Sequence, residues 1–272
     1  MKQQTKTEAR SYLFVPGNRP QRFAKALAAG ADAVILDLED AVGPQEKEQA
    51  RDEVIKWLQG DSKVYVRINA ADTRWFSDEV AALSHNKAVL GIVVPKATDA
   101  ATLRFIGSDA HPDLAILPLL ESAIGFRALD EIAAAPRVDR LLFGTIDFQV
   151  DTGITGDGEE LSYFRSQMTL ASRLAGIGTP VDGVTTSLDD ARQIEEAAWR
   201  ARRFGFGGKL CIHPKQIFPT HMAFTPTSEE YKWARRVIDA AEASAGSATV
   251  VDGKMIDAPV IERAQVILGA AR

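Results

Sequence analysis

The sequence contains a single cysteine, Cys211, among its 272 residues. One cysteine cannot form an internal disulfide, and its place in the apolar run 210–212 suits a buried, reduced thiol. Aromatic residues make up only 7% of the chain, no basic cluster is interleaved with them, and the net charge is −5. The electrostatic case for a nucleic acid partner is therefore missing.

Long apolar runs are also missing, since no stretch of the sequence approaches the length of a membrane-spanning helix. The first ten residues are polar and charged, without an apolar signal segment. With 46% hydrophobic and 25% charged residues, the composition is typical of a globular protein with a large core. We expect a cytoplasmic protein with no membrane partner.

What the sequence does contain is a regular alternation of short apolar strands and helical segments. Strands are expected at residues 11–16, 33–38, 63–69, 90–96, 115–121, 140–147, 179–184 and 209–213. Their spacing of about 28 residues is close to the roughly 30 residues per unit of an eightfold β/α barrel. A doubly wound open sheet alternates in the same way, but the even spacing and the polar residues at the strand ends favour closure.

The fold class predicted from this pattern is α/β, a (β/α)8 TIM barrel over residues 11–218 with a C-terminal helical extension over residues 219–272. In the extension, residues 227–245 read as a helix, 250–259 as an extended segment and 260–271 as a last helix. This extension is expected to pack on its own barrel or on the barrel of a neighbouring subunit.

Two of the expected strands end in an acid. Glu121 follows the apolar run 117–120, and Asp147 ends the run 141–147. If these strands are parallel neighbours, roughly 4.8 Å apart, the two carboxylates at their ends could share one hard divalent cation. This shared cation site is the central hypothesis from the sequence.

Three further acids, Asp37, Glu39 and Asp40, cluster where the second strand ends. Such a cluster is costly unless a cation or basic side chains neutralise it. One interpretation is that the acids surround the metal site, with Asp40 holding metal-bound waters. The other is that one acid caps the following helix while another pairs with Lys47 or Arg51.

Basic residues also occupy strand ends. Arg67 is a charge inside an apolar strand, so it either binds a substrate carboxylate or forms a salt bridge with Glu39. Lys96 could form a Schiff base, although a counter-ion role beside Glu39 or Glu121 is the commoner one. His213 follows the eighth strand and is assigned a supporting role around the site rather than metal ligation.

The first strand ends in a turn that contains Gly17, Asn18 and Arg19 and leads into a helix. The backbone amides of such a turn, together with Arg19, could bind a phosphate group. The alternative is an ordinary glycine and proline turn that carries a surface arginine.

Taken together, these stretches resemble the citrate lyase β-subunit-like group of the HpcH/HpaI aldolase and citrate lyase superfamily. The resemblance covers almost the whole chain, in order, at residues 13–23, 30–42, 66–69, 94–96, 120–122, 143–147, 181–184 and 208–214. Residues 255–257, Met-Ile-Asp, also match an element found near the C-terminus of related lyases and thioesterases.

The resemblance implies a barrel enzyme that binds Mg²⁺, with Mn²⁺ as a possible substitute, through Glu121 and Asp147. It implies that Arg67 holds the carboxylate of a 2-oxo acid, and that residues 17–19 lie near an acyl thioester of CoA or of an acyl-carrier protein. It makes Asp257 the candidate acid/base, entering a neighbouring subunit's site, and therefore implies a homo-oligomer. The alternative for Asp257 is a solvated loop acid without a catalytic role.

The reaction implied is cleavage or formation of a citryl-, malyl- or citramalyl-type thioester, giving an acyl thioester and a 2-oxo acid. Two departures leave the substrate open, because Thr145 and Ile146 replace a common acidic neighbour of Asp147, and Ile124 stands where many relatives have arginine. Two alternatives remain: a Schiff-base aldolase that uses Lys96, and a subunit that is inactive without an acyl-carrier partner.

Overall fold

The computed structural model describes residues 8–60, 62–244 and 248–270, and these form two compact units. The first unit comprises residues 8–221, and the second begins at residue 222, inside helix α10 (Ile217–Phe224). Among the described residues, no helix combines the length and the apolar character needed to span a bilayer. The boundary at residue 218 and the packing of the extension on a barrel stay predictions.

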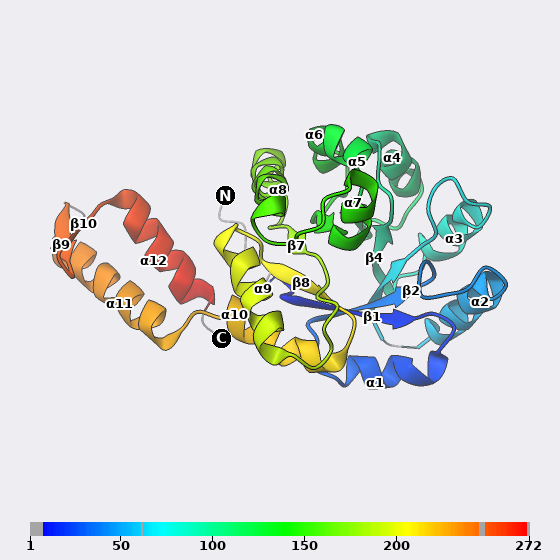
Figure 1. The fold of residues 1–272 in the computed structure, drawn as a ribbon, viewed down its shortest axis with the longest axis horizontal. Coiled ribbons are helices and arrows are strands. Elements are labelled where there is room, and N and C mark those ends of the chain that lie inside the picture. Colours follow the sequence, from blue (N-terminus) through cyan, green and yellow to red (C-terminus); the bar gives the residue numbers. More distant parts are fainter. Residues whose placement is uncertain (1–7, 61, 245–247, 271–272) are drawn as a thin grey trace. The chain divides into compact units, whose positions relative to one another are not determined.

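The first unit is a closed barrel of eight parallel strands (Figure 1). The strands are β1 Ser11–Pro16, β2 Ala33–Asp37, β3 Val64–Arg67, β4 Val89–Val94, β5 Ala115–Leu120, β6 Leu142–Phe143, β7 Val181–Asp182 and β8 Gly208–Cys211. Each strand pairs with the next in sequence order, and β1 also pairs with β8. The predicted (β/α)8 barrel is therefore confirmed, and the open doubly wound sheet is wrong.

Helices follow the strands around the barrel (Figure 1). They are α1 Phe23–Leu27, α2 Lys47–Trp57, α3 Phe76–Leu83, α4 Ala100–Ser108, α5 Ala123–Arg127, α6 Leu129–Ala133, α7 Thr145–Thr152, α8 Ser162–Ala175 and α9 Ala191–Arg203. Three of these starts are marked by capping side chains that accept a hydrogen bond from the first turn: Asp99, Ser122 and Asp190.

The inside of the barrel is filled by apolar side chains that alternate along the strands. They include Tyr12, Ile35, Val93, Leu117, Leu119, Leu142, Val181 and Leu210, all of them buried. Because successive side chains of a strand point to opposite faces, the residues next to these face the helices. The barrel centre is thus a packed core, and the open space lies at the end of the strands.

The second unit is a helical hairpin with a small β-ribbon. Helix α11 (Ser228–Ala243) begins with a capping box between Thr227 and Glu230, and α12 spans Ala258–Ala270. Between them, β9 (Thr249–Val251) pairs with β10 (Lys254–Ile256), where we expected one extended segment. Asp252 and Gly253 turn the chain there with positive φ angles of 51° and 75°. The predicted helix ends at 245 and 271 lie outside the described residues.

Candidate active site

A cavity of about 420 Å³ lies at the carboxyl ends of the barrel strands, where β/α barrels carry their chemistry. Its charged lining comes from residues at or just after the ends of β2, β3, β5 and β6. These are Asp37, Asp40, Arg67, Glu121 and Asp147. The structure therefore brings together the two acids of the predicted cation site and the arginine predicted to bind a carboxylate.

Glu121 directly follows β5, and its side chain is buried at the cavity wall. The backbone N–H of Lys96 donates to Glu121 Oε1 at 2.6 Å. Burial raises the pKa of Glu121 to about 8, and the negative charges of Glu39 and Asp147 add to this effect. The ionised form of Glu121 is therefore unfavourable in this position unless a positive charge, such as a metal ion, lies beside it.

Gly144 makes room for this carboxylate. A Cβ atom added at residue 144 would lie 2.6 Å from both Cβ and Oε2 of Glu121. The backbone N–H of Gly144 donates to the Leu120 carbonyl at 2.9 Å, which fixes the close approach of the two chain segments. Gly144 was not predicted as a site residue, although a glycine directly after an apolar strand is a recognisable sign of such an approach.

Asp147 does not end a strand as predicted. Strand β6 stops at Phe143, and helix α7 begins at Thr145, so Asp147 lies in the first turn of a helix and is exposed. An acid in the first helical turn is stabilised by the unpaired amides and the helix dipole. Glu121 and Asp147 line one cavity, and their sharing of one cation stays a prediction, whereas the strand-end position of Asp147 is wrong.

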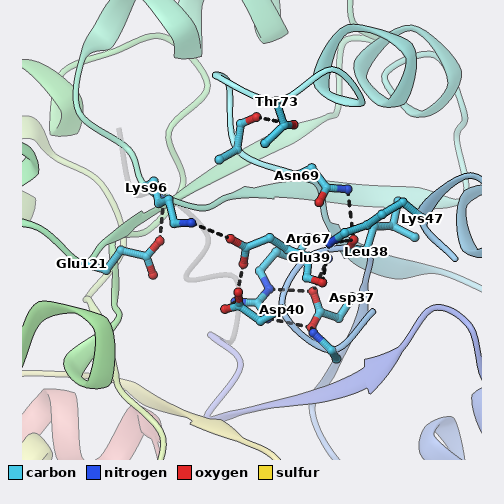
Figure 2. A network of polar contacts seen from close by, with 12 residues as sticks. Asp37, Leu38, Glu39, Asp40, Lys47, Arg67, Asn69, Thr73, Lys96 and Glu121 are labelled. Carbon is cyan, nitrogen blue, oxygen red and sulfur yellow. Dashed lines mark hydrogen bonds and ion pairs between the residues drawn. The ribbon is translucent and has the colours of Figure 1, made fainter. Parts of the chain in front are cut away.

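Arg67 is held by acids of the chain itself (Figure 2). Its Nε and Nη2 atoms donate to the two carboxylate oxygens of Asp37 at 2.7 and 2.6 Å. Its Nη1 atom lies 3.0 Å from Glu39 Oε2 and 3.4 Å from Asp40 Oδ2, and the guanidinium stacks on Phe14 at 4.8 Å. The salt-bridge interpretation is thus present in the structure, and a substrate carboxylate would meet only the remaining N–H groups.

Glu39 is the second buried acid of the group. Burial raises the pKa of Glu39 to about 7, against the opposing charge of Arg67. Its Oε2 atom is close to Arg67 but has no partner in hydrogen-bond geometry. Glu39 and Glu121 are therefore two buried acids, each with a pKa raised toward or above neutrality.

Lys96 connects these two acids (Figure 2). Its Nζ atom lies 3.6 Å from Glu39 Oε1, while its backbone N–H donates to Glu121. Burial by itself would lower the pKa of Lys96, but the negative charges of Glu39 and Asp40 outweigh it and raise this pKa above its ordinary value. An amine kept protonated is a poor nucleophile, so the geometry favours the counter-ion role over a Schiff base.

The remaining acids and bases after β2 do not pair as the sequence alternative proposed. Lys47 Nζ donates to the backbone carbonyls of Leu38 and Glu39 at 2.9 and 2.6 Å. Asp37 accepts from the backbone N–H groups of Glu39 and Ala41 at 2.9 and 3.2 Å. These bonds make the acid-bearing loop rigid, and this role of Lys47 was not foreseen.

The turn after β1 differs from the predicted phosphate site. The N–H of Gly17 donates to the Asp37 carbonyl at 2.7 Å, and that of Arg19 donates to the Pro16 carbonyl at 3.0 Å. Asn18 Nδ2 donates to Glu46 Oε2 at 3.0 Å. The amides of residues 17 and 19 are thus engaged within the chain, and the exposed Arg19 side chain remains as the group that could meet an anion. Phosphate binding by residues 17–19 stays a prediction.

His213 and Asp257 both act as caps. His213 Nδ1 accepts from the Lys215 N–H at 3.2 Å, and the cavity lining among the described residues includes Ile212 but not His213. Asp257, in the second unit, is exposed, and its Oδ1 accepts from the Val260 N–H at 3.4 Å at the start of α12. An acid/base role for Asp257 in a neighbouring subunit stays a prediction.

The donor set of the cavity suits a metal with few protein ligands. Within the described ranges, no cluster of three or more His, Cys, Asp or Glu side chains has the arrangement of a metal site. Glu121 and Asp147 offer two carboxylates, and Mg²⁺ is commonly held by one or two carboxylates, water and substrate oxygens. The residues present therefore fit Mg²⁺ better than zinc, which takes three or four protein ligands.

Comparison with known sequences agrees with this geometry. A family model described as HpcH/HpaI aldolase/citrate lyase matches residues 10–214. The chain is 36% identical to a citrate lyase subunit beta-like protein from Deinococcus radiodurans, over 95% of this chain and 96% of the relative. It is also 36% identical to a (3S)-malyl-CoA thioesterase from Cereibacter sphaeroides, over 91% of this chain and 89% of the relative.

Solved structures show the same fold. Protein CitE from Mycobacterium tuberculosis, crystallised with magnesium, acetoacetate and coenzyme A, superposes with a TM-score of 0.84 and 32% identity over 97% of this chain and 98% of that chain. RipC from Yersinia pestis has a TM-score of 0.72 and 33% identity, covering 82% of this chain and 98% of its own.

Proposed function

Because the chain belongs to the HpcH/HpaI aldolase/citrate lyase family, we propose that it is a Mg²⁺-dependent carbon–carbon lyase. The family is one of enzymes, and the relatives above include a citrate lyase subunit beta-like protein and a (3S)-malyl-CoA thioesterase. The substrate of the proposed reaction is a 3-hydroxy-3-carboxyacyl thioester. Breaking its C2–C3 bond gives an acyl thioester and a 2-oxo acid, and the same site can form the bond in reverse.

One observation carries this proposal: Glu121, Asp147 and Arg67 line a single cavity at the carboxyl ends of the strands. Two carboxylates provide for a cation, and a buried arginine provides for the substrate carboxylate. A 2-hydroxy acid group presents a hydroxyl and a carboxylate side by side, so it can use both at once. The site is thus suited to the end of the substrate where the bond breaks.

The electrostatics of the site support a bound Mg²⁺. Glu39 and Glu121 have raised pKa values, and Oε2 of Glu39 lacks a hydrogen bond. A divalent cation held by Glu121 and Asp147 would favour the ionised form of these acids. The magnesium in the similar CitE crystal supports this metal, and Mn²⁺ accepts the same oxygen ligands.

The metal's contribution is Lewis-acid stabilisation of the negative charge that develops on the substrate hydroxyl oxygen. The side chains of the chain do the rest. Asp37 fixes the plane of the Arg67 guanidinium, so its remaining N–H groups can orient the substrate carboxylate and with it the breaking bond. The hydroxyl proton leaves, and the electrons of the O–H bond form the carbonyl of the 2-oxo acid. The electrons of the broken C2–C3 bond pass to the thioester as an enolate, and a proton returned to C2 completes the acyl thioester.

We assign the proton transfer to Asp257 of a neighbouring copy, which makes homo-oligomerisation part of the proposal. The support is that Asp257 is an exposed carboxylate beside Met255, a methionine that is 67% exposed. The coenzyme A in the similar crystal makes CoA thioesters the first carrier to test, ahead of an acyl-carrier protein. Dependence on such a carrier protein is the alternative that remains.

A thioesterase activity is the second candidate, because a (3S)-malyl-CoA thioesterase is as similar to this chain as the citrate lyase-like relative. The two activities differ in their products. Hydrolysis releases free CoA and an intact hydroxy acid, whereas the lyase releases acetyl-CoA and a 2-oxo acid. Product analysis with one CoA thioester therefore separates them.

The proposal is tested by titrating metal-stripped protein with Mg²⁺ and a 2-oxo acid in a calorimeter, for wild type, Glu121→Ala and Asp147→Ala. We expect metal-dependent binding in the wild type and its loss in both variants. Glu131→Ala, at an exposed glutamate of α6, is the matched control and should bind like the wild type. Unchanged Mg²⁺-dependent binding and turnover in both site variants would falsify the assignment.

A further inference from the structure

The charged residues of the cavity lining are confined to one side of the barrel. They lie at or just after the ends of β2, β3 and β5 and in the first turn of α7, where the apolar Leu119, Phe143 and Ile146 also line the cavity. From β7 over β8 to β1 the lining is apolar. It consists there of Val184, Leu210, Ile212, Phe14 and Pro16. Because the barrel is closed, these two arcs face each other across the cavity.

The apolar arc has a floor and a rim. Leu210 is buried and belongs to the barrel core, and the partly buried Val184 packs against the same core. Ile212 is 41% exposed and stands at the outer edge of the arc. A group that fills this half of the cavity therefore meets hydrocarbon from the floor to the rim.

The positive charge of the lining is confined to the other arc. Arg67 is the one cation that lines the cavity in the described ranges. Asp37 occupies two of its donor atoms, and the third, Nη1, lies 3.0 Å from Glu39 Oε2. A substrate carboxylate at the metal side would use the N–H groups of Arg67 that these acids leave open. A second carboxylate, carried on the other substituent of the same carbon, would have to lie against the apolar arc without a partner there, which is costly.

We propose that the apolar arc selects the remaining substituent on C3 of the substrate, the carbon that carries the hydroxyl and the carboxylate. This substituent is a small alkyl group. This inference rests on the proposed lyase function and names its substrate class. The 2-oxo acid is then a monocarboxylic one with an alkyl side chain, such as pyruvate, and the thioester is of the citramalyl type. Val184, Leu210 and Ile212 are the specificity-determining residues.

The apolar character of the arc also predicts the order in which the competing substrates are preferred. A methyl group buried in an apolar pocket is favoured over hydrogen by roughly 10-fold or more. A carboxymethyl group brings an unpaired charge to the same place and is disfavoured more strongly. The expected order is therefore citramalyl-type above malyl-type, and malyl-type above citryl-type.

The test compares kcat/KM for Mg²⁺-dependent cleavage of three CoA thioesters that differ only in this substituent: methyl, hydrogen and carboxymethyl. We expect the methyl compound to lead by about 10-fold or more. If the carboxymethyl compound is cleaved as well or better, the inference is overturned while the lyase function stands. If none is cleaved, lyase activity of the isolated chain on CoA thioesters is overturned, and the binding measurement below decides the inference.

Binding gives a second measurement that does not depend on turnover. Calorimetry with Mg²⁺ should show pyruvate binding more tightly than freshly dissolved oxaloacetate. The reverse order overturns the proposal even if the protein needs a carrier partner for catalysis. Binding of neither acid overturns the inference and the proposed function together.

A charge placed on the apolar arc should shift the preference. In Ile212→Arg the new side chain starts from an exposed position, and the bond from the residue's backbone N–H to Gln216 Oε1 is kept. We expect the ratio of carboxymethyl to methyl cleavage to rise by about 10-fold or more. Ile212→Gln should raise it less, since it adds polarity without charge.

The control for a general attraction of anionic substrates is Val150→Arg. Val150 is 81% exposed on α7 and is outside the cavity lining, so this variant should keep the wild-type preference. An equal shift in Val150→Arg and Ile212→Arg would overturn the role of the arc. So would a folded Ile212→Arg protein, checked by circular dichroism, with an unchanged preference.

Discussion

Two carboxylates of the candidate metal site are held in opposite ways. Glu121 is buried, with its Oε1 atom accepting from the Lys96 N–H, whereas Asp147 is exposed on the first turn of α7. Glu121, which must be ionised in its buried position to bind the metal, is therefore the carboxylate that the protein holds in place. Its position depends on a neighbour without a side chain, Gly144, so a single methyl group there should disturb the site.

We predict that Gly144→Ala weakens Mg²⁺ binding by about tenfold or more while the protein still folds. The added Cβ would lie 2.6 Å from Oε2 of Glu121, and such overpacking costs about 1–3 kcal/mol, which is enough to displace the carboxylate. Mg²⁺ affinity by calorimetry and the thermal midpoint measure the two effects.

Gly60→Ala is the matched control for this substitution. Its added Cβ would meet nothing closer than the Trp57 carbonyl at 3.7 Å, an ordinary contact. Magnesium affinity should stay at the wild-type value in that variant. Equal affinities in Gly144→Ala and wild type would show that the close approach to Glu121 has no part in metal binding.

At the scale of elements, the apolar runs predicted where strands lie, but not where each strand ends. The run 141–147 is a short apolar stretch ending in an acid and was taken as part of a strand over 140–147, yet only Leu142 and Phe143 form strand β6. Residues from Thr145 onward form α7 instead, because the ring of Phe148 packs among other aromatic rings. Its centroid lies 4.5 Å from that of Phe164 and 4.7 Å from that of Phe126. These rings come from distant parts of the chain, so local periodicity could not reveal the helix.

The partner of Arg67 was likewise only partly predictable. The sequence showed a buried arginine with three acids nearby, and this was enough to expect a salt bridge or a bound carboxylate. Which acid takes the bidentate position depends on the register between β2 and β3, which places Asp37 beside Arg67. Register is a tertiary property, so Glu39 was named where Asp37 makes the closer contact.

A hydrogen bond to Asp151 connects helix α7 to α5, in addition to the contact of Phe148 with Phe126, and should support the metal site. Asp151 Oδ2 accepts from the Ala123 N–H at 2.7 Å, although an acid in the last turn of a helix is unfavourable to the dipole. We predict that Asp151→Ala lowers the unfolding free energy by about 1–2 kcal/mol and weakens Mg²⁺ binding, but less than Asp147→Ala does.

Asp151→Asn keeps an acceptor oxygen at the same place and should recover most of both losses. Denaturant unfolding and calorimetry give the two values for each variant. If Asp151→Ala binds Mg²⁺ and unfolds like the wild type, this hydrogen bond between α5 and α7 does not contribute to the site.

For the whole molecule, the acids at the carboxyl end of the barrel make stability depend on pH, because folding buries Glu39 and Glu121 and disfavours their ionised forms. In the unfolded chain Glu39 and Glu121 titrate near 4.5, whereas in the folded protein burial raises their pKa values to about 7 and about 8. The folded state therefore binds more protons between pH 4.5 and 8. Linkage then requires the stability of the metal-free protein to fall as the pH rises through this range.

We accordingly predict that metal-stripped protein loses at least about 1 kcal/mol of unfolding free energy between pH 5.5 and pH 8, measured by denaturant titration. Glu39→Gln removes one of the two titrating groups but keeps the pairing of Arg67 with Asp37, so its loss should be smaller. Added Mg²⁺ should stabilise the wild type more at pH 8 than at pH 5.5, because it binds the ionised Glu121. A metal-free stability that is flat or rises with pH, or one with the same slope in Glu39→Gln, would mean that these acids are not held protonated by the fold.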